Sequence, residues 1–183
     1  ELLFPGEVVL GEGESYTTPI LYTGFGSDGF SSLSQQFHQY IRSNILQHSA
    51  ESKPRPVHYN TWEGIYFDHD EATLKALADK VAPLGIERFV LDDGWFKGRR
   101  HDKAGLGDWF VDEEIYPEGL NGLIDHVTGL GMEFGIWFEP EMVNPDSDLY
   151  RNHPEWALQS ENNPHVPFRN QYVLDLTNND VVE

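Results

Sequence analysis

The sequence predicts an α/β fold with parallel strands, and a repeated pattern carries this prediction. Residues 84–93 (LGIERFVLDD) and 130–139 (LGMEFGIWFE) both begin with Leu-Gly, continue through Ile or Met and Glu, and then run through apolar residues to an acid. Each follows a segment with apolar residues at helical spacing. Strands that are buried on both faces read as continuous apolar runs, and their alternation with helices is typical of parallel strands joined by crossovers.

The two helices are indicated by spacing and by their end signals. Before the first repeat, apolar residues fall on one helical face, with Asp70 as the N-cap and residues 83–85 (Pro-Leu-Gly) as the stop. Before the second repeat the same spacing ends at Gly131. The apolar residues are Leu74, Leu77, Ala78 and Val81 in the first helix, and Leu120, Leu123, Ile124, Val127 and Leu130 in the second.

Two further strands are predicted around these units. Residues 56–64 (PVHYNTWEG) precede the first helix, and residues 171–176 (QYVLDL) follow the second repeat. Four strands of this kind suit either a doubly wound sheet or part of a (β/α)8 barrel. Because no G-x-G-x-x-G follows the first strand, the dinucleotide-binding version of the doubly wound sheet is less favoured.

The first 50 residues have a different character. Residues 7–25 (EVVLGEGESYTTPILYTGF) predict antiparallel strands with turns at residues 11–13, and apolar spacing then predicts a helix that ends near residues 44–47. Residues 49–56 (SAESKPRP) have the composition of a linker. We therefore expect residues 1–50 to be the end of a preceding β domain with its linking helix, and residues 51–183 to form half of an α/β barrel. A complete barrel needs about 250 residues.

Composition limits the partners. The chain of 183 residues has 12 Lys and Arg against 31 Asp and Glu, a formal net charge of −19, so contact with nucleic acid or an anionic membrane would be repulsive and a neutral ligand is favoured. The absence of cysteine excludes a disulfide, a thiolate metal site and a thiol nucleophile, and weakly favours the cytoplasm without excluding secretion. The chain begins at Glu1 rather than at a methionine, so we expect it to be a fragment.

Acidic and aromatic residues gather where the predicted strands end. In parallel α/β folds the ligand binds outside the carboxyl ends of the strands. Indole rings beside carboxylates suit a sugar, whose C–H faces stack on aromatic rings while its hydroxyls donate to carboxylates. Helix capping or solvated turns would explain any one aspartate equally well, but four successive strand ends carry the combination. The residues are Asn60, Trp62, Glu63, Asp92, Asp93, Trp95, Trp137, Glu139, Glu141 and Asp175.

The adjacent pair Asp92 and Asp93 favours binding over acid–base chemistry. The two carboxyl groups of a glycosidase must straddle the scissile bond, roughly 5 to 9.5 Å apart. Neighbours at one strand end rarely do so, but they can accept hydrogen bonds from two adjacent hydroxyls. One structural and one functional aspartate is a further interpretation, because strand neighbours point to opposite faces.

Other polar residues leave alternatives open. Asp92, Glu139 and Asp175 together suggest a magnesium site, which adjacent indoles would crowd. The basic residues of 95–109 are expected to pair with neighbouring carboxylates rather than with a substrate. Arg169 enters an apolar stretch and needs carboxylate or substrate oxygens as partners. A metal-dependent barrel enzyme and a non-catalytic sugar-binding protein are the alternative functions.

Several long motifs, in order, resemble the α-galactosidases of glycoside hydrolase family 36. The likeness runs from about residue 55 to the end, and the first 50 residues are similar only loosely, to the end of the family's N-terminal β-sandwich. The motifs are NTWEG at 60–64, FVLDDGWF at 89–96, LGDWFVDEEIYPEGL at 106–120, GIWFEPEMVNPDSDLY at 135–150, HPEWAL at 153–158 and RNQYVLDL at 169–176.

The resemblance implies a retaining hydrolase of terminal α-galactosyl groups in raffinose- or melibiose-type sugars, with no cofactor and with tetramers among bacterial members. It implies a (β/α)8 barrel, of which this chain would hold strands 1–4. Asp92 and Asp93 resemble the pair that binds the 4- and 6-hydroxyls of galactose, and Trp62, Trp137 and Arg169 resemble residues that line the galactose subsite.

The chain departs from the family in its catalytic residues. The family's nucleophile is an aspartate in a Lys-x-Asp motif, and its acid/base is a later aspartate. No Lys-x-Asp occurs here, so we expect both groups to lie beyond residue 183 and the 183-residue segment alone to be inactive.

Overall fold

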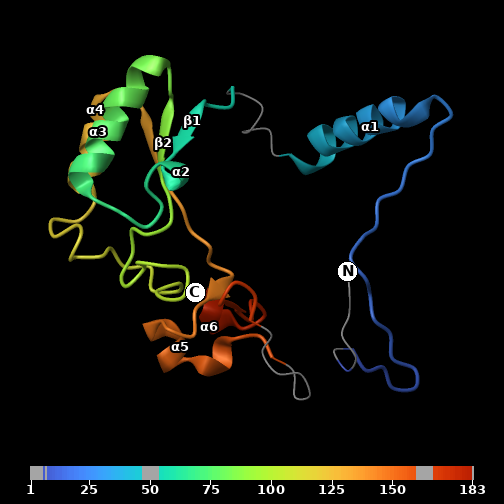
Figure 1. Cartoon of the computed structure of the whole chain (residues 1–183). Helices are drawn as coiled ribbons and strands as arrows, with labels where there is room; N and C mark the ends of the chain where they lie inside the picture. Colours follow the sequence, from blue (N-terminus) through green and yellow to red (C-terminus); the bar gives the residue numbers. More distant parts are fainter. Residues whose placement is uncertain (1–5, 7, 47–53, 160–166, 183) are drawn as a thin grey trace. The chain divides into compact units, whose positions relative to one another are not determined.

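A computed structural model describes residues 6, 8–46, 54–159 and 167–182, and the chain divides into two compact units, residues 1–55 and 56–183. The first unit contains helix α1 (Gly29–Tyr40), which continues into the π-helical turn η1 (Ile41–Ile45) (Figure 1). The predicted helix ending near residues 44–47 is therefore confirmed. The predicted linker at 49–56 lies mostly outside the described residues.

The antiparallel strands predicted for residues 7–25 do not form in the described part of the first unit. The predicted turn is present, since the backbone N–H of Glu14 donates to the carbonyl of Gly11 (3.2 Å). The segment on either side is extended, and its apolar side chains, such as Leu21 and Phe25, are exposed. A strand requires a partner for its backbone groups, and the described residues of this unit do not provide one, so the prediction of paired strands was wrong for them.

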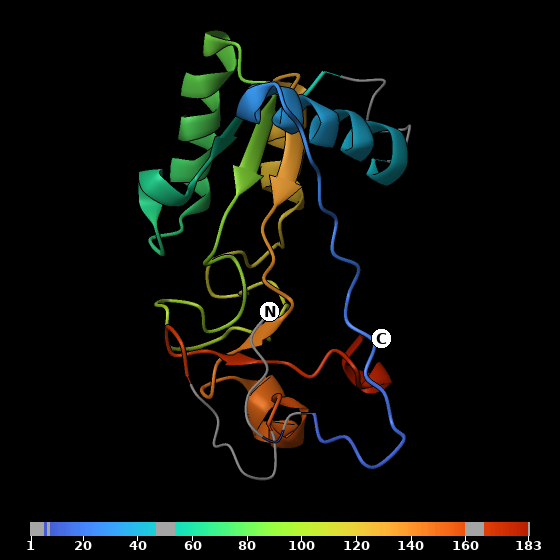
Figure 2. The same cartoon turned by 90° about the vertical axis from the view of Figure 1, so that its right-hand side faces the viewer.

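The second unit is built on a three-stranded parallel sheet in the order β1-β2-β3 (Figures 1 and 2). The strands are β1 (His58–Asn60), β2 (Arg88–Leu91) and β3 (Glu133–Ile136). Their register aligns Asn60 with Val90, and Val90 with Gly135, so the three carboxyl ends lie at one edge. The three predicted strands in this region are confirmed, and so is the α/β class.

Two helices provide the crossovers and the core. Helix α3 (Glu71–Val81) and helix α4 (Asn121–Gly129) lie side by side in Figure 1 and bury apolar residues against the sheet. The Asp70 side chain caps α3 by accepting a bond from the N–H of Thr73 (2.8 Å), and the side chain and backbone N–H of Thr73 together lower the pKa of Asp70. The core includes Leu74, Ala78, Val81, Phe89, Leu91, Leu123 and Val127.

Both predicted helix stops are confirmed. After α3, the 3₁₀ turn η3 (Ala82–Leu84) ends at Gly85 with φ +87°, and after α4 the chain turns at Gly131 with φ +84°. Such left-handed positions favour glycine, which has no Cβ to clash. The repeated Leu-Gly is therefore the exit from each helix into the following strand.

The prediction of a fourth parallel strand at 171–176 was wrong. Strand β5 (Tyr172–Val173) instead pairs antiparallel with β4 (Met142–Val143) in a separate two-stranded sheet. A short apolar run is compatible with either arrangement, because the run does not specify its partner. The remaining short elements are α2 (Trp62–Ile65), α5 (Asp148–Asn152), η4 (Pro154–Trp156) and α6 (Asn179–Val182).

Long irregular segments connect the parallel sheet to the two-stranded sheet β4-β5. Residues 92–120 follow β2 and residues 137–141 follow β3, and Figure 1 shows both as loops leaving the same edge of the sheet. None of the helices in the described ranges is both long and apolar enough to cross a membrane.

Candidate sugar-binding site

The carboxyl ends of the three parallel strands open onto a cavity of about 630 Å³. Each strand contributes residues at or just beyond its carboxyl end, and the later loops contribute the rest. The lining residues are Asn60, Trp62, Glu63, Asp92, Asp93, Arg99, Trp137, Phe138, Glu139, Glu141 and Arg169.

All five predicted site residues line this cavity, namely Trp62, Asp92, Asp93, Trp137 and Arg169. Two other residues from the predicted strand ends have different positions. Trp95 is buried in the core, and Asp175 accepts bonds from the backbone N–H (3.0 Å) and hydroxyl (2.6 Å) of Thr177 in the turn after β5.

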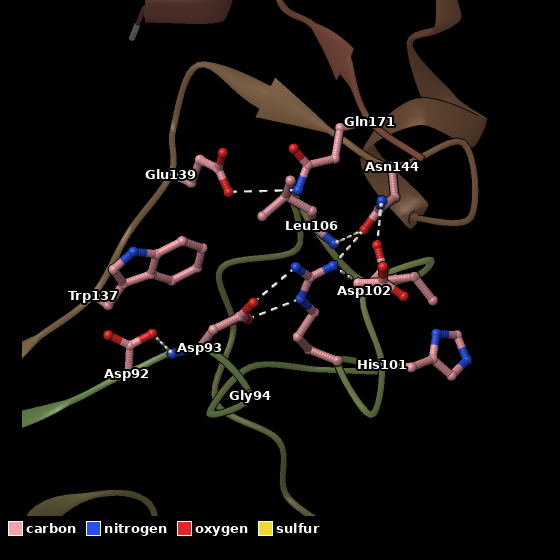
Figure 3. Close-up of polar contacts among 12 residues, drawn as sticks. Asp92, Asp93, Gly94, His101, Asp102, Leu106, Trp137, Glu139, Asn144 and Gln171 are labelled. Atoms are coloured by element: carbon pink, nitrogen blue, oxygen red, sulfur yellow. Dashed lines mark hydrogen bonds and ion pairs between the residues drawn. The ribbon is translucent and has the colours of Figure 1, made fainter. Parts of the chain in front are cut away.

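Neutral donors hold the Asp92 carboxylate. One oxygen accepts a bond from the Asn60 side-chain amide. The other accepts from the backbone N–H of Asp93 at 2.7 Å, as Figure 3 shows. The backbone N–H of Asp92 donates to the hydroxyl of Thr61 at 3.0 Å. Asp92 is 9% exposed, so few positions remain from which a ligand can reach it.

A buried cation holds the Asp93 carboxylate. Arg99 donates from Nε and Nη2 to the two carboxylate oxygens of Asp93, both at 2.8 Å, and is only 1% exposed. Its guanidinium carbon lies 5.4 Å from the ring centroid of Phe67 and 5.8 Å from that of Phe96. A two-pronged arginine–carboxylate pair fixes both the position and the plane of the carboxylate. The repulsion between the neighbouring aspartates is thus offset on the Asp93 side.

The basic residues of 95–109 behave as the sequence indicated. Lys97 pairs with Asp148 at 2.8 Å, Arg100 pairs with Asp112 at 3.3 Å, and Arg99 pairs with Asp93. The sequence did not single out Arg99 from its neighbours. Its burial depends on how the loop folds back under the strand end, and no local pattern signals that.

His69 and Tyr116 support the backbone at Asp93. The His69 ring makes 2.8 Å contacts from Nε2 to the Asp93 carbonyl oxygen and from Nδ1 to the Tyr116 hydroxyl. A carbonyl only accepts, so Nε2 carries the proton and Nδ1 accepts from the hydroxyl. Burial lowers the pKa of His69 and raises the pKa of Tyr116, so both groups are neutral near pH 7.

Aromatic residues support the two cavity tryptophans. The indole N–H of Trp95 donates to the backbone carbonyl of Trp137 at 2.9 Å. Trp62 packs edge-on against Tyr66 and Phe67, and its backbone N–H donates to the side-chain oxygen of Asn60 at 2.8 Å. Both indoles are half-buried, so each retains surface that faces solvent. Such partly exposed rings beside carboxylates can accept the C–H face of a sugar.

Glu139 and Arg169 belong to the part of the cavity farther from the sheet. Partial burial, reinforced by Glu141, raises the pKa of Glu139, whereas Arg169 and Arg99 act in the opposite direction. The Gln171 amide lies 3.5 Å from a Glu139 oxygen (Figure 3). Arg169 is exposed and lines the cavity, so its guanidinium is accessible to a ligand there.

The suggested magnesium ligands do not converge. Asp92 and Glu139 line the cavity, but Asp175 is engaged in its own turn by Thr177. Within the ranges that the structure describes, no group of three or more histidine, aspartate or glutamate side chains is arranged to hold a metal ion.

Comparison with known proteins shows the family of the chain. The melibiase family model matches residues 15–183. The chain belongs to the melibiase family. The α-galactosidase of Escherichia coli is 53% identical over 175 residues, which are 96% of this chain and 25% of that protein. The predicted resemblance to family 36 α-galactosidases is therefore confirmed.

Solved structures of melibiase relatives match the fold. The α-galactosidase from Lactobacillus brevis has a TM-score of 0.80 and 44% identity, over 86% of this chain and 21% of that one. A substituted form of the GH36 α-galactosidase AgaA from Geobacillus stearothermophilus, solved in complex with raffinose, has a TM-score of 0.76 and 46% identity, over 81% of this chain and 21% of that one. The chain thus spans about a quarter of the length of the curated relatives it matches.

Proposed function

We propose that this chain forms the galactose-binding part of an α-galactosidase, which removes terminal α-galactosyl groups from raffinose- and melibiose-type sugars. One observation carries the proposal: in a melibiase family chain, two fixed carboxylates, two partly exposed indoles and one exposed arginine line a single cavity. Asp92 and Asp93 accept hydrogen bonds from the 4- and 6-hydroxyls, and Trp62 and Trp137 contact the apolar face of the sugar. Arg169 donates to a sugar oxygen.

The proposed reaction is a retaining double displacement. A carboxylate nucleophile forms a covalent glycosyl intermediate, and water then hydrolyses it with help from an acid/base residue. Asp92 and Asp93 are engaged side by side in binding, so we assign neither of them to these roles. We assign the nucleophile and the acid/base to other residues of the complete protein, so the 183-residue segment by itself is inactive.

The proposal extends to the architecture. The parallel order β1-β2-β3 with helices between successive strands fits the beginning of a (β/α)8 barrel, with residues 51–183 in the barrel and residues 1–50 at the end of a β-sandwich. The complete protein is a homo-oligomer, in our proposal a tetramer.

Hydrolysis of an aryl α-galactoside tests the activity. We expect turnover by the complete gene product that contains these residues, and none by purified residues 1–183. If the complete product binds galactose without turning over the aryl galactoside, a non-catalytic sugar-binding protein replaces the proposed enzyme. Turnover by residues 1–183 alone contradicts the assignment of the catalytic residues.

Asp92→Asn tests the binding role. Asp93→Asn is a poor test, because it leaves the buried Arg99 without its carboxylate, whereas Asp92 has no charged partner and an asparagine there keeps an acceptor for one of its two neutral donors. Hydrogen bonds to charged groups contribute about 1.5–3 kcal/mol, so we expect galactose to bind roughly 10- to 100-fold more weakly.

The comparison sugar is glucose, which differs from galactose in the direction of the 4-hydroxyl. We expect Asp92→Asn to reduce the preference for galactose over glucose, while Glu118→Gln, at an exposed position outside the cavity lining, leaves both affinities unchanged. Equal losses for both sugars contradict the assignment of Asp92 to that hydroxyl.

A further inference from the structure

Asn144 is a completely buried side chain behind the cavity. It follows β4 and is 0% exposed. Its Oδ1 accepts bonds from Arg99 Nη1 at 2.8 Å and from the backbone N–H of Leu106 at 2.9 Å. Its Nδ2 donates to the backbone carbonyl of Asp102 at 3.2 Å (Figure 3) and to that of Asn170 at 2.8 Å. Both amide lone pairs and both amide protons are therefore used.

The side-chain oxygen of Asn144 is connected to Asp93 through Arg99. Arg99 uses Nε and Nη2 for Asp93, and its Nη1 donates to Asn144 and to the backbone carbonyl of Ala104 at 3.0 Å. The guanidinium is planar, so fixing Nη1 also fixes the direction in which the other two nitrogens hold the carboxylate. Asn144 thus sets the orientation of Asp93 through Arg99.

The other side of Asn144 leads to Arg169. Phe168 and Gln171 exchange two backbone hydrogen bonds (3.1 and 3.0 Å) around the two-residue turn Arg169-Asn170. Both turn residues have positive φ, +53° for Arg169 and +63° for Asn170. A turn of this kind usually has glycine, asparagine or aspartate at the two central positions, and an arginine at positive φ is disfavoured. The bond from Asn144 to the Asn170 carbonyl helps to hold this costly conformation.

We propose that Asn144 is a positioning residue that fixes the Asp93 carboxylate and the turn that carries Arg169 relative to each other across the cavity. A sugar with oxygens at two fixed positions then meets an acceptor and a donor at a set separation. This inference deepens the proposed galactose-binding function and rests on it for its ligand. Asn144 itself does not line the cavity and acts only through its partners.

Asn144→Asp selectively removes the hydrogen bonds that the Asn144 amide donates. The carboxylate still accepts from Arg99 and from Leu106, but it has no N–H for the carbonyls of Asp102 and Asn170 and places an oxygen against them. We expect galactose to bind at least 10-fold more weakly to the complete gene product, as followed by tryptophan fluorescence. If the added charge prevents folding, Asn144→Ala removes the same donor without it, and the same loss is expected.

A double-mutant cycle separates positioning from general damage. Arg169→Lys weakens galactose binding by itself, and if Asn144 acts through Arg169, then adding Asn144→Asp to Arg169→Lys causes a further loss of less than about threefold, because coupled residues are not additive. A further loss as large as in the wild-type background overturns the proposal.

Rescue provides the second readout. Glycine readily takes positive φ, so Asn170→Gly stabilises the turn without help from Asn144. We expect Asn170→Gly alone to change galactose affinity by less than about twofold and to restore most of the affinity lost in Asn144→Asp. No restoration overturns the role of the turn.

The crystal structure of the Asn144→Asp variant tests the inference independently of the sugar. We expect the turn to leave its positive φ conformation at residues 169 and 170 while Arg99 keeps both bonds to Asp93. An unchanged turn overturns the positioning role. A different result separates the two proposals. If the wild-type protein does not bind galactose but the turn is rearranged in the variant, the proposed function is overturned, while the role of Asn144 in holding the turn is supported.

Discussion

The cavity has two walls that are built differently. The sheet wall, formed by Asn60, Trp62 and Asp92, is held by hydrogen bonds from neutral donors at the ends of adjacent strands. The loop wall, formed by Asp93, Arg99 and Arg169, is held by a buried ion pair and by Asn144. Asp92 and Asp93 are neighbours in sequence, yet each belongs to a different wall.

The geometry of the two walls has different physical origins. The parallel register places Asn60 and Asp92 beside each other, so the sheet wall follows from strand pairing. The loop wall joins segments that are far apart in sequence and have little regular structure, so its geometry depends on satisfying buried polar groups. A buried unpaired charge is costly, and this cost selects one arrangement of the loops. The loop wall should therefore be the more sensitive of the two to single substitutions.

Arg99→Leu is expected to have the largest effect on the loop wall. It leaves the Asp93 carboxylate, which is 6% exposed, without a counter-charge, and it leaves Asn144 Oδ1 with one partner fewer. Removing one partner of a buried pair costs about 3–5 kcal/mol in the free energy of unfolding. Urea denaturation of the complete gene product measures this loss.

Lys97→Leu is the matched control for Arg99→Leu. Lys97 lies in the same loop and also pairs with an aspartate, but both partners, Lys97 and Asp148, are exposed. We expect little change in unfolding free energy, because solvent screens such pairs. Similar losses for the two variants contradict the view that a buried pair holds the loop wall.

Gly94→Ala is expected to have a smaller effect, at the junction of the two walls. Gly94 has φ +113°, and an added Cβ would lie 2.8 Å from His69 Nε2, which holds the Asp93 carbonyl. We expect a loss of about 2–3 kcal/mol from backbone strain and crowding. Thermal unfolding of the purified variant measures it.

Gly98→Ala separates crowding from backbone strain. Gly98 has φ +72°, and an added Cβ there meets nothing within 4 Å, so only the left-handed penalty of about 1 kcal/mol remains. Equal losses for Gly94→Ala and Gly98→Ala would show that the His69 contact does not constrain the junction.

The sequence predicted the sheet wall better than the loop wall. Helical spacing, the Asp70 cap and the Leu-Gly exits located the helices and strands, and so placed Asn60, Trp62 and Asp92 at one edge. These signals are local, with periods that the chain itself displays. The five candidate residues consequently line one cavity in the structure, although their roles remain predictions.

The loop wall could not be predicted because its contacts are not periodic. Arg99 is one of several basic residues in its loop, and nothing local distinguishes the buried one from its exposed neighbour Lys97. Asn144 lies in the motif at 135–150, in which only apolar, aromatic and acidic residues were candidates for the core or the site. Its hydrogen bonds reach residues 26 to 45 positions away in the sequence. The strand prediction at 171–176 failed for the same reason, since pairing with β4 is a tertiary choice.

The smallest expected effect is a pH dependence that originates at His69. Burial lowers the pKa of His69 in the folded protein below its ordinary value of 6.5, and Arg100 adds to this, whereas the bond to the Asp93 carbonyl acts in the opposite direction. The unfolded chain therefore binds the proton more readily than the folded one. Stability is fully present above about pH 6.5 and falls as the pH decreases from there towards the folded pKa.

His69→Gln is the control, since glutamine offers an N–H donor and an oxygen acceptor but does not titrate. We expect the variant to lose less of its unfolding free energy than the wild type between pH 7 and pH 5. Protonation of His69 also removes the Nδ1 acceptor that Tyr116 uses, so the loop wall loses this contact, whereas Nε2 still donates to the Asp93 carbonyl and Asp92 keeps its neutral donors. Parallel pH profiles for the two proteins would mean that this dependence comes from other groups and that the walls respond to acid alike.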